Sequence, residues 1–427
     1  MTRIVITGIG AVTPVGNSFH ESWEAIKAGR TGVGPITRFD ASRIPWRVAG
    51  ELRGFDPLPF IGPKEVKRTD PFVHYAVAAA VMAAGDAGLI DGYGAAGHNR
   101  VRSRHTGYLG TGGIIIGSSR GGISTIEHAL SRNPSLNAPR AVSSLSLRLS
   151  PYLMPATTIG MAASLSARIL GIKGHCLGIS NACSSGLNAV GEAFRLLRSG
   201  YEGPVLSGGS EAPICRLCVE GYGRAGALSA IRDFSASRPF TRTRDGFVIA
   251  EGSCVMVLER LDAAVRRNAC IYGEIIGYAN TTDAFHQTRP DIRGEAGAVR
   301  QAVAAAGVRL EEIDYINAHG TSTPLGDMTE AGAIAMVFGD LTPGVPVSAL
   351  KSMTGHMLAA SGSLETAFTA MSLKEGIIPP TLNVPPRDDC CNIALVREVT
   401  MKKMRLALTN SFGFGGLNAV AVLKKFP

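Results

Sequence analysis

Short β-rich runs alternate with Ala-rich helical stretches along all 427 residues, and this alternation constrains the fold more than any other feature of the sequence. Such a pattern is typical of an α/β fold in which helices cover a largely buried sheet. The predicted strands are 4–7, 114–116, 205–207, 247–250, 254–258, 273–278, 315–317, 405–409 and 419–423.

The predicted helices have recognisable ends. Asp70 and Pro71 supply an N-cap and a first-turn proline for a helix over 72–84. Further helices are predicted over 184–197, 298–306 and 361–374, each followed by a glycine that can close it. No Pro-rich or Ser-rich linker divides the chain, and a soft boundary lies near 259–268, so we expect two halves that share one core. An Arg/His-rich stretch over 91–106 is predicted to be a surface loop.

Composition excludes several classes of protein. The content of 45% hydrophobic and 18% charged residues indicates a compact enzyme, and 6% aromatic residues argue against a nucleic-acid stacking platform. The longest apolar run, 75–84, is far shorter than the ~20 residues that span a bilayer. The N-terminus enters a strand directly rather than a signal peptide, which favours a cytoplasmic location. We therefore predict neither a nucleic-acid partner nor a membrane partner.

Charge and cysteine content narrow the partners and cofactors. The net charge of +9 favours an acidic partner, and eight irregularly spaced cysteines fit a reducing compartment. Cys215 and Cys218 have the spacing of half a zinc site, but Cys390 and Cys391 are adjacent and make a poor second half, so no metal site is predicted. Gly8 and Gly10 near the N-terminus lack the third glycine of a dinucleotide-binding motif, so no bound NAD is predicted.

One cysteine has the surroundings of a nucleophile. Cys183 follows a β-rich run and precedes the helix predicted over 184–197, which places it at a helix N-terminus. The free N–H groups and the dipole at that position favour a thiolate, so a lowered thiol pKa is predicted. The same N–H groups can bind an oxyanion, and Gly186 leaves room for close backbone approach. For Cys183 taken alone, a small packing cysteine is the alternative.

Three further loops carry chemistry in the second half of the chain. His319 follows the strand predicted over 315–317, at the strand end where α/β proteins place ligand chemistry. Lys351 and His356 share a Gly-containing turn, and the loop 412–416 alternates Phe with Gly, which offers backbone N–H groups and two movable rings. Each loop alone could be an ordinary loop histidine, a helix cap or a tight turn. Together with the Cys183 loop they suit acyl transfer followed by carbanion generation.

These motifs, in this order, resemble the β-ketoacyl-acyl-carrier-protein synthases of the elongating, synthase I/II-like class. The resemblance runs nearly end to end, through 3–10 (RIVITGIG), 13–16 (TPVG), 181–186 (NACSSG), 237–240 (SRPF), 244–247 (RDGF) and the three loops above. It implies a thiolase-like α/β fold of two similar βαβαβαββ halves in a five-layer α-β-α-β-α sandwich. Residues 1–262 would form the half with the cysteine, and 263–427 the half with the histidines, the lysine and the Phe/Gly loop.

The resemblance also implies a role for each residue in a decarboxylative Claisen condensation. Cys183 would accept the acyl group, with its own N–H and that of Phe412 as the oxyanion hole and the Phe412 ring as a gate. His319 and His356, as neutral donors, would stabilise the enolate formed from malonyl carrier protein. The other implied roles are pairing of Lys351 with Glu330 to hold the histidine geometry, and contacts of Thr321 and Thr323 with the pantetheine arm.

The implied partners are an acidic acyl carrier protein and a second ketosynthase-like subunit. No separate cofactor is implied, because the substrates are attached to the phosphopantetheine of the carrier protein. The positions that match carrier contacts are Lys64, Lys67, Arg68 and Arg224. The dimer could be a homodimer or a heterodimer.

Two departures from the family pattern bear on the substrate. Arg120 occupies a position that resembles the far end of the acyl pocket, where elongating fatty-acid synthases carry small or apolar residues, although it could instead face solvent. The segment 133–148 also looks longer and more polar than in those enzymes. Both favour a polyketide or short-chain role over fatty-acid synthesis. The alternative from another class is a non-catalytic, chain-length-factor-type subunit, which Cys183 disfavours; a thiolase is disfavoured because it needs a second active-site cysteine.

Overall fold

A computed structural model describes residues 2–91, 106–132, 149–385 and 391–427. The predicted surface loop over 91–106, apart from its ends, and the polar segment 133–148 lie outside the described residues, as does Cys390.

The strands are β1 (Ile4–Val12), β2 (Val33–Pro35), β3 (Val48–Gly50), β4 (Gly113–Gly117), β5 (Cys176–Ile179), β6 (Val205–Glu211), β7 (Gly252–Arg260), β8 (Gly273–Thr282), β9 (Tyr315–Asn317), β10 (Pro346–Ser348), β11 (Ile377–Ile378), β12 (Ala394–Leu395), β13 (Thr400–Met401), β14 (Leu406–Gly413) and β15 (Leu417–Lys424). The helices are α1 (Phe19–Lys27), α2 (Pro63–Val66), α3 (Pro71–Asp86), α4 (Thr106–Gly110), α5 (Ile123–Ser131), α6 (Leu153–Thr157), α7 (Met161–Leu170), α8 (Ser185–Arg198), α9 (Arg216–Arg224), α10 (Leu261–Arg266), α11 (Ile292–Ala306), α12 (Pro324–Phe338), α13 (Lys351–Thr354) and α14 (Ala359–Glu375). Short 3-10 turns cover Leu310–Glu312 and Gly339–Gly344.

The main sheet repeats one strand pattern in its two halves. Its order is β12-β10-β9-β14-β15-β8-β1-β7-β6-β4-β5. From the middle outwards, β1, β7 and β6 pair antiparallel and then β4 and β5 pair parallel; β8, β15 and β14 pair antiparallel and then β9 and β10 pair parallel. An antiparallel pairing of β1 with β8 joins the halves.

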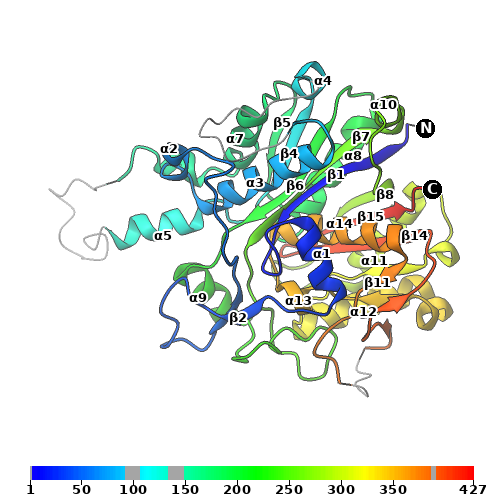
Figure 1. The fold of residues 1–427 in the computed structure, drawn as a ribbon. Coiled ribbons are helices and arrows are strands. Elements are labelled where there is room, and N and C mark those ends of the chain that lie inside the picture. Colours follow the sequence, from blue (N-terminus) through cyan, green and yellow to red (C-terminus); the bar gives the residue numbers. More distant parts are fainter. Residues whose placement is uncertain (1, 92–105, 133–148, 386–390) are drawn as a thin grey trace.

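Helices form three layers around these two half-sheets. α3 packs on β1, β6 and β7, while α11 packs on β8 and β15 at the other side of the molecule. Between them lie α8 and α14, which pack on each other and on strands of both halves (Figure 1). The predicted thiolase-like fold is therefore confirmed.

Glycine permits the close approach of the two central helices. A Cβ atom at Gly186 would overlap the carbonyl oxygen of Ala359, so only glycine fits there, as the sequence indicated. Because α8 follows Cys183 and α14 follows His356, this contact brings the loops from the two halves together.

Most predicted elements are present, with boundaries extended by a few residues. Asp70 caps α3 by accepting a hydrogen bond from the Phe72 N–H. The strand predicted over 247–250 is wrong: the segment makes only isolated bridges, one of them between Ile249 and His356, so it supports the histidine loop rather than the sheet. Within the described residues, no helix is long and apolar enough to cross a membrane.

Candidate active site

Cys183 sits on a sharp turn between β5 and α8. Ala182 adopts a φ of 48°, in the left-handed region that a side chain disfavours. The turn is held by hydrogen bonds that local serines donate: Ser184 Oγ to the Asn181 carbonyl at 2.7 Å and Ser185 Oγ to the Ala182 carbonyl at 2.6 Å. This strained geometry places the thiol just before the first turn of α8.

The predicted lowering of the Cys183 pKa is wrong. The thiol is buried, and burial raises its pKa to about 11, although Arg120, Lys351 and a hydrogen bond from the Phe414 N–H act in the opposite direction. Desolvation of the thiolate therefore outweighs the favourable position beside the helix. The resting nucleophile is a protonated thiol.

His319 is held by its backbone and by a lysine. The N–H groups of His319 and Gly320 donate to the two carboxylate oxygens of Glu330 at 2.8 and 2.7 Å. Lys351 Nζ donates to the His319 carbonyl at 2.6 Å and lies 3.3 Å from its Nδ1. An ammonium can only donate, so Nδ1 accepts and the proton of the neutral ring is on Nε2.

His356 lies beside His319 with its ring nearly perpendicular. The ring centroids are 5.4 Å apart at an interplanar angle of 85°. His356 Nδ1 contacts Ser361 Oγ at 3.1 Å, and the Phe247 ring packs edge-on against the imidazole. Burial, and then the charge of Lys351, lower the pKa of both histidines well below the ordinary value. Both rings are therefore neutral, as predicted.

The predicted pairing of Lys351 with Glu330 is wrong. Lys351 Nζ forms an ion pair of 2.5 Å with Glu365 on α14, and both side chains are buried. Glu330 instead accepts hydrogen bonds from the backbone of the His319 loop and from Asn410 Nδ2, the latter at 3.1 Å. The fourteen-residue spacing of Lys351 and Glu365 carries no pattern from which the pair could have been predicted.

The two phenylalanines of the glycine loop differ from the expectation. Phe412 is a buried residue of β14 whose ring packs against His319 at 5.9 Å. The backbone amide that acts on the Cys183 thiol is that of Phe414, whereas the predicted oxyanion-hole role of the Phe412 N–H stays a prediction. Phe414 is 37% exposed and sits in the turn between β14 and β15. The sequence motif contains both rings, but it does not show where β14 ends. That boundary decides that Phe412 is packed and Phe414 is accessible.

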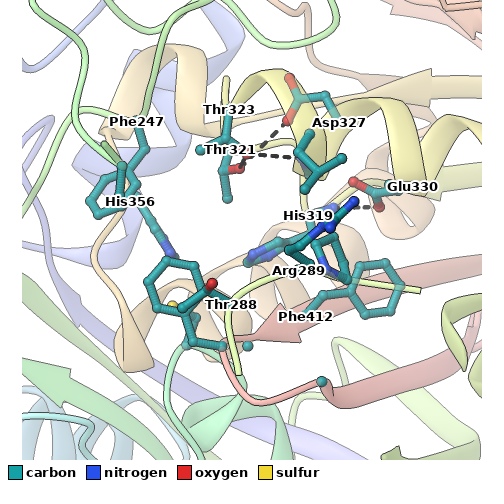
Figure 2. Close-up of a pocket in the computed structure, with 18 of the residues that line it drawn as sticks. Phe247, Thr288, Arg289, His319, Thr321, Thr323, Asp327, Glu330, His356 and Phe412 are labelled. Atoms are coloured by element: carbon teal, nitrogen blue, oxygen red, sulfur yellow. Dashed lines mark hydrogen bonds between the residues drawn. The ribbon is translucent and has the colours of Figure 1, made fainter. Parts of the chain in front are cut away.

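One pocket of about 370 Å³ collects these groups. Cys183, His319 and His356 line it together with both phenylalanines. Figure 2 shows His319, His356, Phe247 and Phe412 around the same cavity, with Thr321 and Thr323 on its wall. The site thus joins a thiol from the first half of the chain to two imidazoles from the second.

The predicted arm-binding threonines also line the pocket. Thr321 Oγ1 and Thr323 Oγ1 lie 3.0 Å apart, and Thr323 caps α12. Arg120 is not among the lining residues. Its Nε donates to Tyr222 Oη at 2.8 Å, and Tyr222 lines the pocket beside Cys183, so the guanidinium reaches the site through that ring.

The four basic residues predicted to meet a carrier are all exposed. Lys64, Lys67 and Arg68 lie on or just after α2, and Arg224 ends α9 next to Ala225 and Gly226, which line the pocket. α2 and α9 lie on the same side of the molecule in Figure 1.

Among the described residues, no cluster of three or more His, Cys, Asp or Glu side chains could hold a metal. Behind the catalytic loops, however, Asn317 Oδ1, Thr409 Oγ1 and Glu365 Oε2 are buried without a hydrogen-bond partner among the described residues. Asn317 pairs with Thr409 in register, and its Nδ2 donates to the Glu365 carbonyl. Two oxygens from the sheet and one from α14 are of the type that a hard cation prefers.

Comparison with known proteins identifies the family. The β-ketoacyl synthase N-terminal domain profile matches residues 1–264, and the C-terminal domain profile matches residues 272–385. The chain belongs to the β-ketoacyl synthase family. It is 41% identical to 3-oxoacyl-[acyl-carrier-protein] synthase 2 of Synechocystis sp. and 39% identical to that of Coxiella burnetii, each over 99% of this chain and 98% of the relative.

Solved structures of related ketosynthases share the whole fold. The ishigamide ketosynthase/chain length factor superposes with a TM-score of 0.89 at 33% identity. A type II polyketide ketosynthase, AntDE, solved with the carrier protein AntF and a hexaketide, superposes with a TM-score of 0.87 at 29% identity. Both cover 100% of each chain. The enzyme is thus an acyltransferase of the ketosynthase type, and the alternative of a non-catalytic subunit is not supported.

Proposed function

We propose that this synthase loads an acyl group onto Cys183 and condenses it with a malonyl unit, both delivered by an acyl carrier protein. The observation that carries the proposal is the shared pocket of Cys183, His319 and His356. A thiol nucleophile and two neutral imidazole donors are what the two half-reactions need.

In the first half-reaction the Cys183 sulfur attacks the thioester carbonyl of the acyl carrier. The new C–S bond to Cys183 forms, the bond to the carrier sulfur breaks, and the Cys183 proton passes to the leaving thiol. We expect the N–H groups of Cys183 and Phe414 to stabilise the oxyanion of the intermediate. Because the thiol is protonated at rest, attack and proton loss occur together.

In the second half-reaction malonyl carrier loses carbon dioxide. The electron pair of the broken C–C bond moves to the thioester carbonyl as an enolate, to which the Nε2–H groups of His319 and His356 donate hydrogen bonds. The enolate carbon attacks the acyl-Cys183 carbonyl, and the Cys183 thiolate leaves and takes up a proton. Lys351 and Glu365 position the His319 ring, while Glu330 anchors its backbone.

The carrier's phosphopantetheine arm would pass Thr321 and Thr323, and no separate cofactor is required. The Phe414 ring, which is the accessible one, is the proposed gate for the acyl chain. The basic residues Lys64, Lys67 and Arg68 with Arg224 are the proposed contacts of an acidic carrier, consistent with the net charge of +9. A cytoplasmic location, near the carrier pool, completes the proposal.

The acyl substrate is proposed to be short or oxygenated, as in type II polyketide synthesis. The observation in favour is the Arg120–Tyr222 hydrogen bond, in which the exposed Arg120 adds a charged group behind a ring of the pocket wall. Fatty-acid elongation is the second candidate, favoured by the curated relatives, which are named 3-oxoacyl-[acyl-carrier-protein] synthase 2.

We further propose that a second ketosynthase-like subunit binds along β5. This strand ends the sheet, so its outer edge is free to pair within the described residues. Leu177 on β5 is 40% exposed. A free strand edge that carries an exposed apolar side chain fits a dimer. The partner is either a second copy or a related chain.

The test is intact-mass analysis after mixing the enzyme with carrier proteins that bear acyl chains of graded length. Wild type should gain the acyl mass, while Cys183→Ala should not, and addition of malonyl carrier should discharge it. The preferred chain decides between the two pathways. If no chain transfers while a co-purified homologue becomes acylated, the catalytic proposal fails.

A further inference from the structure

Glu295 is a buried acid in the active-site pocket to which the mechanism above assigns no role. It lies in the first turn of α11, is 1% exposed and forms part of the pocket wall. Its Oε2 is buried without a hydrogen-bond partner, and no other described residue bonds its carboxyl group. A buried polar group in this state costs free energy unless a ligand or water completes it.

The surroundings of Glu295 define what such a ligand can be. The carboxyl groups around it are Asp283, Asp291, Asp327 and Glu330, and each raises its pKa in addition to the larger effect of burial. The other titratable groups of the pocket wall are Cys183, Tyr222, Arg289, His319 and His356. Behind the wall, Arg244 contacts Asp327 and Lys351 contacts His319. Burial and these acids raise the pKa of Glu295, so it holds its proton more tightly than an exposed acid, and the protonated carboxyl group has an O–H to donate.

The other acids of the cluster already have partners. Asp283 accepts from Asn418 Nδ2 at 2.6 Å, Asp327 from the Phe240 N–H at 2.7 Å, and Glu330 from the His319 loop. An anionic ligand group would be repelled by these carboxylates, so the malonyl carboxylate is excluded from this corner. A neutral acceptor, such as an amide carbonyl, fits the free O–H. Figure 2 shows Asp327 and Glu330 on the same side of the cavity as Thr321 and Thr323.

We propose that Glu295 is a further substrate-binding residue, whose carboxyl group donates a hydrogen bond to an amide carbonyl of the phosphopantetheine arm. This inference rests on the proposed function, because it assumes that the arm enters this pocket. It assigns to the arm a third polar contact, in addition to Thr321 and Thr323. The contact selects for a neutral arm and leaves the acyl group unconstrained.

The test compares binding of holo and apo carrier protein by calorimetry, since only the holo form bears the arm. Glu295→Leu is expected to weaken holo binding about three- to tenfold and to leave apo binding unchanged. Glu295→Gln keeps a neutral donor of the same size, so holo binding should stay within about twofold. Glu311→Leu, the same change at an exposed position outside the pocket, is the matched control.

A pH series separates the proposal from a structural role. Wild-type affinity for the holo carrier should fall at alkaline pH as Glu295 ionises, whereas Glu295→Gln should show no such fall. Unchanged holo binding by Glu295→Leu overturns the inference, as does an equal loss of apo binding with a lowered Tm. If wild type itself does not distinguish holo from apo carrier, the arm does not enter the pocket and the proposed function fails as well.

Discussion

Removing the positive charge of Lys351 should destabilise the enzyme strongly. Lys351 is fully buried and its Nζ is bonded to Glu365, which is 2% exposed. Lys351→Met leaves a buried carboxyl group without its partner, which costs about 3–5 kcal/mol. For 427 residues, an unfolding entropy of about 2.1 cal/mol/K per residue gives about 0.9 kcal/mol/K, so the Tm should fall by about 3–6 °C.

A second variant separates charge from packing. Lys351→Met/Glu365→Gln removes both charges and keeps the side-chain volumes, so at least half of the lost Tm should return. Calorimetry measures the Tm, and intact mass after acyl loading reports whether Cys183 still reacts. Loading should survive in both variants, because Lys351 positions His319 for the second half-reaction. A wild-type Tm in Lys351→Met, or a double variant no more stable than the single one, would refute the reasoning.

Further predictions test the thiol, the loop, the cation site and the orphaned acid. The rate of Cys183 alkylation by iodoacetamide should rise about tenfold per pH unit from pH 7 to 10, given a pKa of about 11, and a plateau below pH 9 would contradict it. In urea unfolding, Phe414→Ala should change the free energy of unfolding by less than about 0.5 kcal/mol, whereas Phe412→Ala should lower it by about 3–5 kcal/mol. Equal effects would mean that the two rings are packed alike. The unpaired oxygens of Asn317, Thr409 and Glu365 can be tested for cation binding. Dialysis against a chelator should lower the Tm, and added K⁺, Na⁺, Mg²⁺ or Ca²⁺ should restore it in a concentration-dependent way. A Tm that is independent of all four cations would contradict a cation site. Burial raises the pKa of Glu295 in the folded state, whereas the unfolded chain releases this proton above about pH 4.3, so the contribution of Glu295 to stability falls as pH rises from there. Glu295→Gln should therefore raise the Tm at pH 7, and a lower Tm would show that the carboxylate is charged and paired.

The sequence predicted which residues form the reaction centre, but not all of their ion pairs and pKa values. Cys183, His319 and His356 could be named because each follows a recognisable strand or precedes a recognisable helix, and motif order indicated the family. The partner of Lys351 and the pKa of Cys183 could not, because both depend on burial and on contacts between α14 and loops distant in sequence. Phe412 and Phe414 are two residues apart, and only the end of β14 decides which ring is packed.

Glu295 shows a different limit of sequence reasoning. It lies in the first turn of a helix, where an acid is normally read as a favourable partner of the helix dipole. Its lack of a hydrogen-bond partner emerges only when α11 packs against α12 and closes the pocket. The predicted boundary between 1–262 and 263–427 remains a prediction, because the two halves share one sheet and one pair of central helices.

The contact between α8 and α14 has a consequence for synthesis of the chain on the ribosome. When Cys183 emerges, the helix that covers the next turn of α8 has not yet been translated, since Gly186 meets Ala359 more than 170 residues later. The apolar inner face of α8 therefore stays exposed until the second half of the chain has been synthesised. Folding that depends on such distant contacts is slow and exposes surface that chaperones bind. A nascent chain released early should aggregate rather than yield an active half-enzyme.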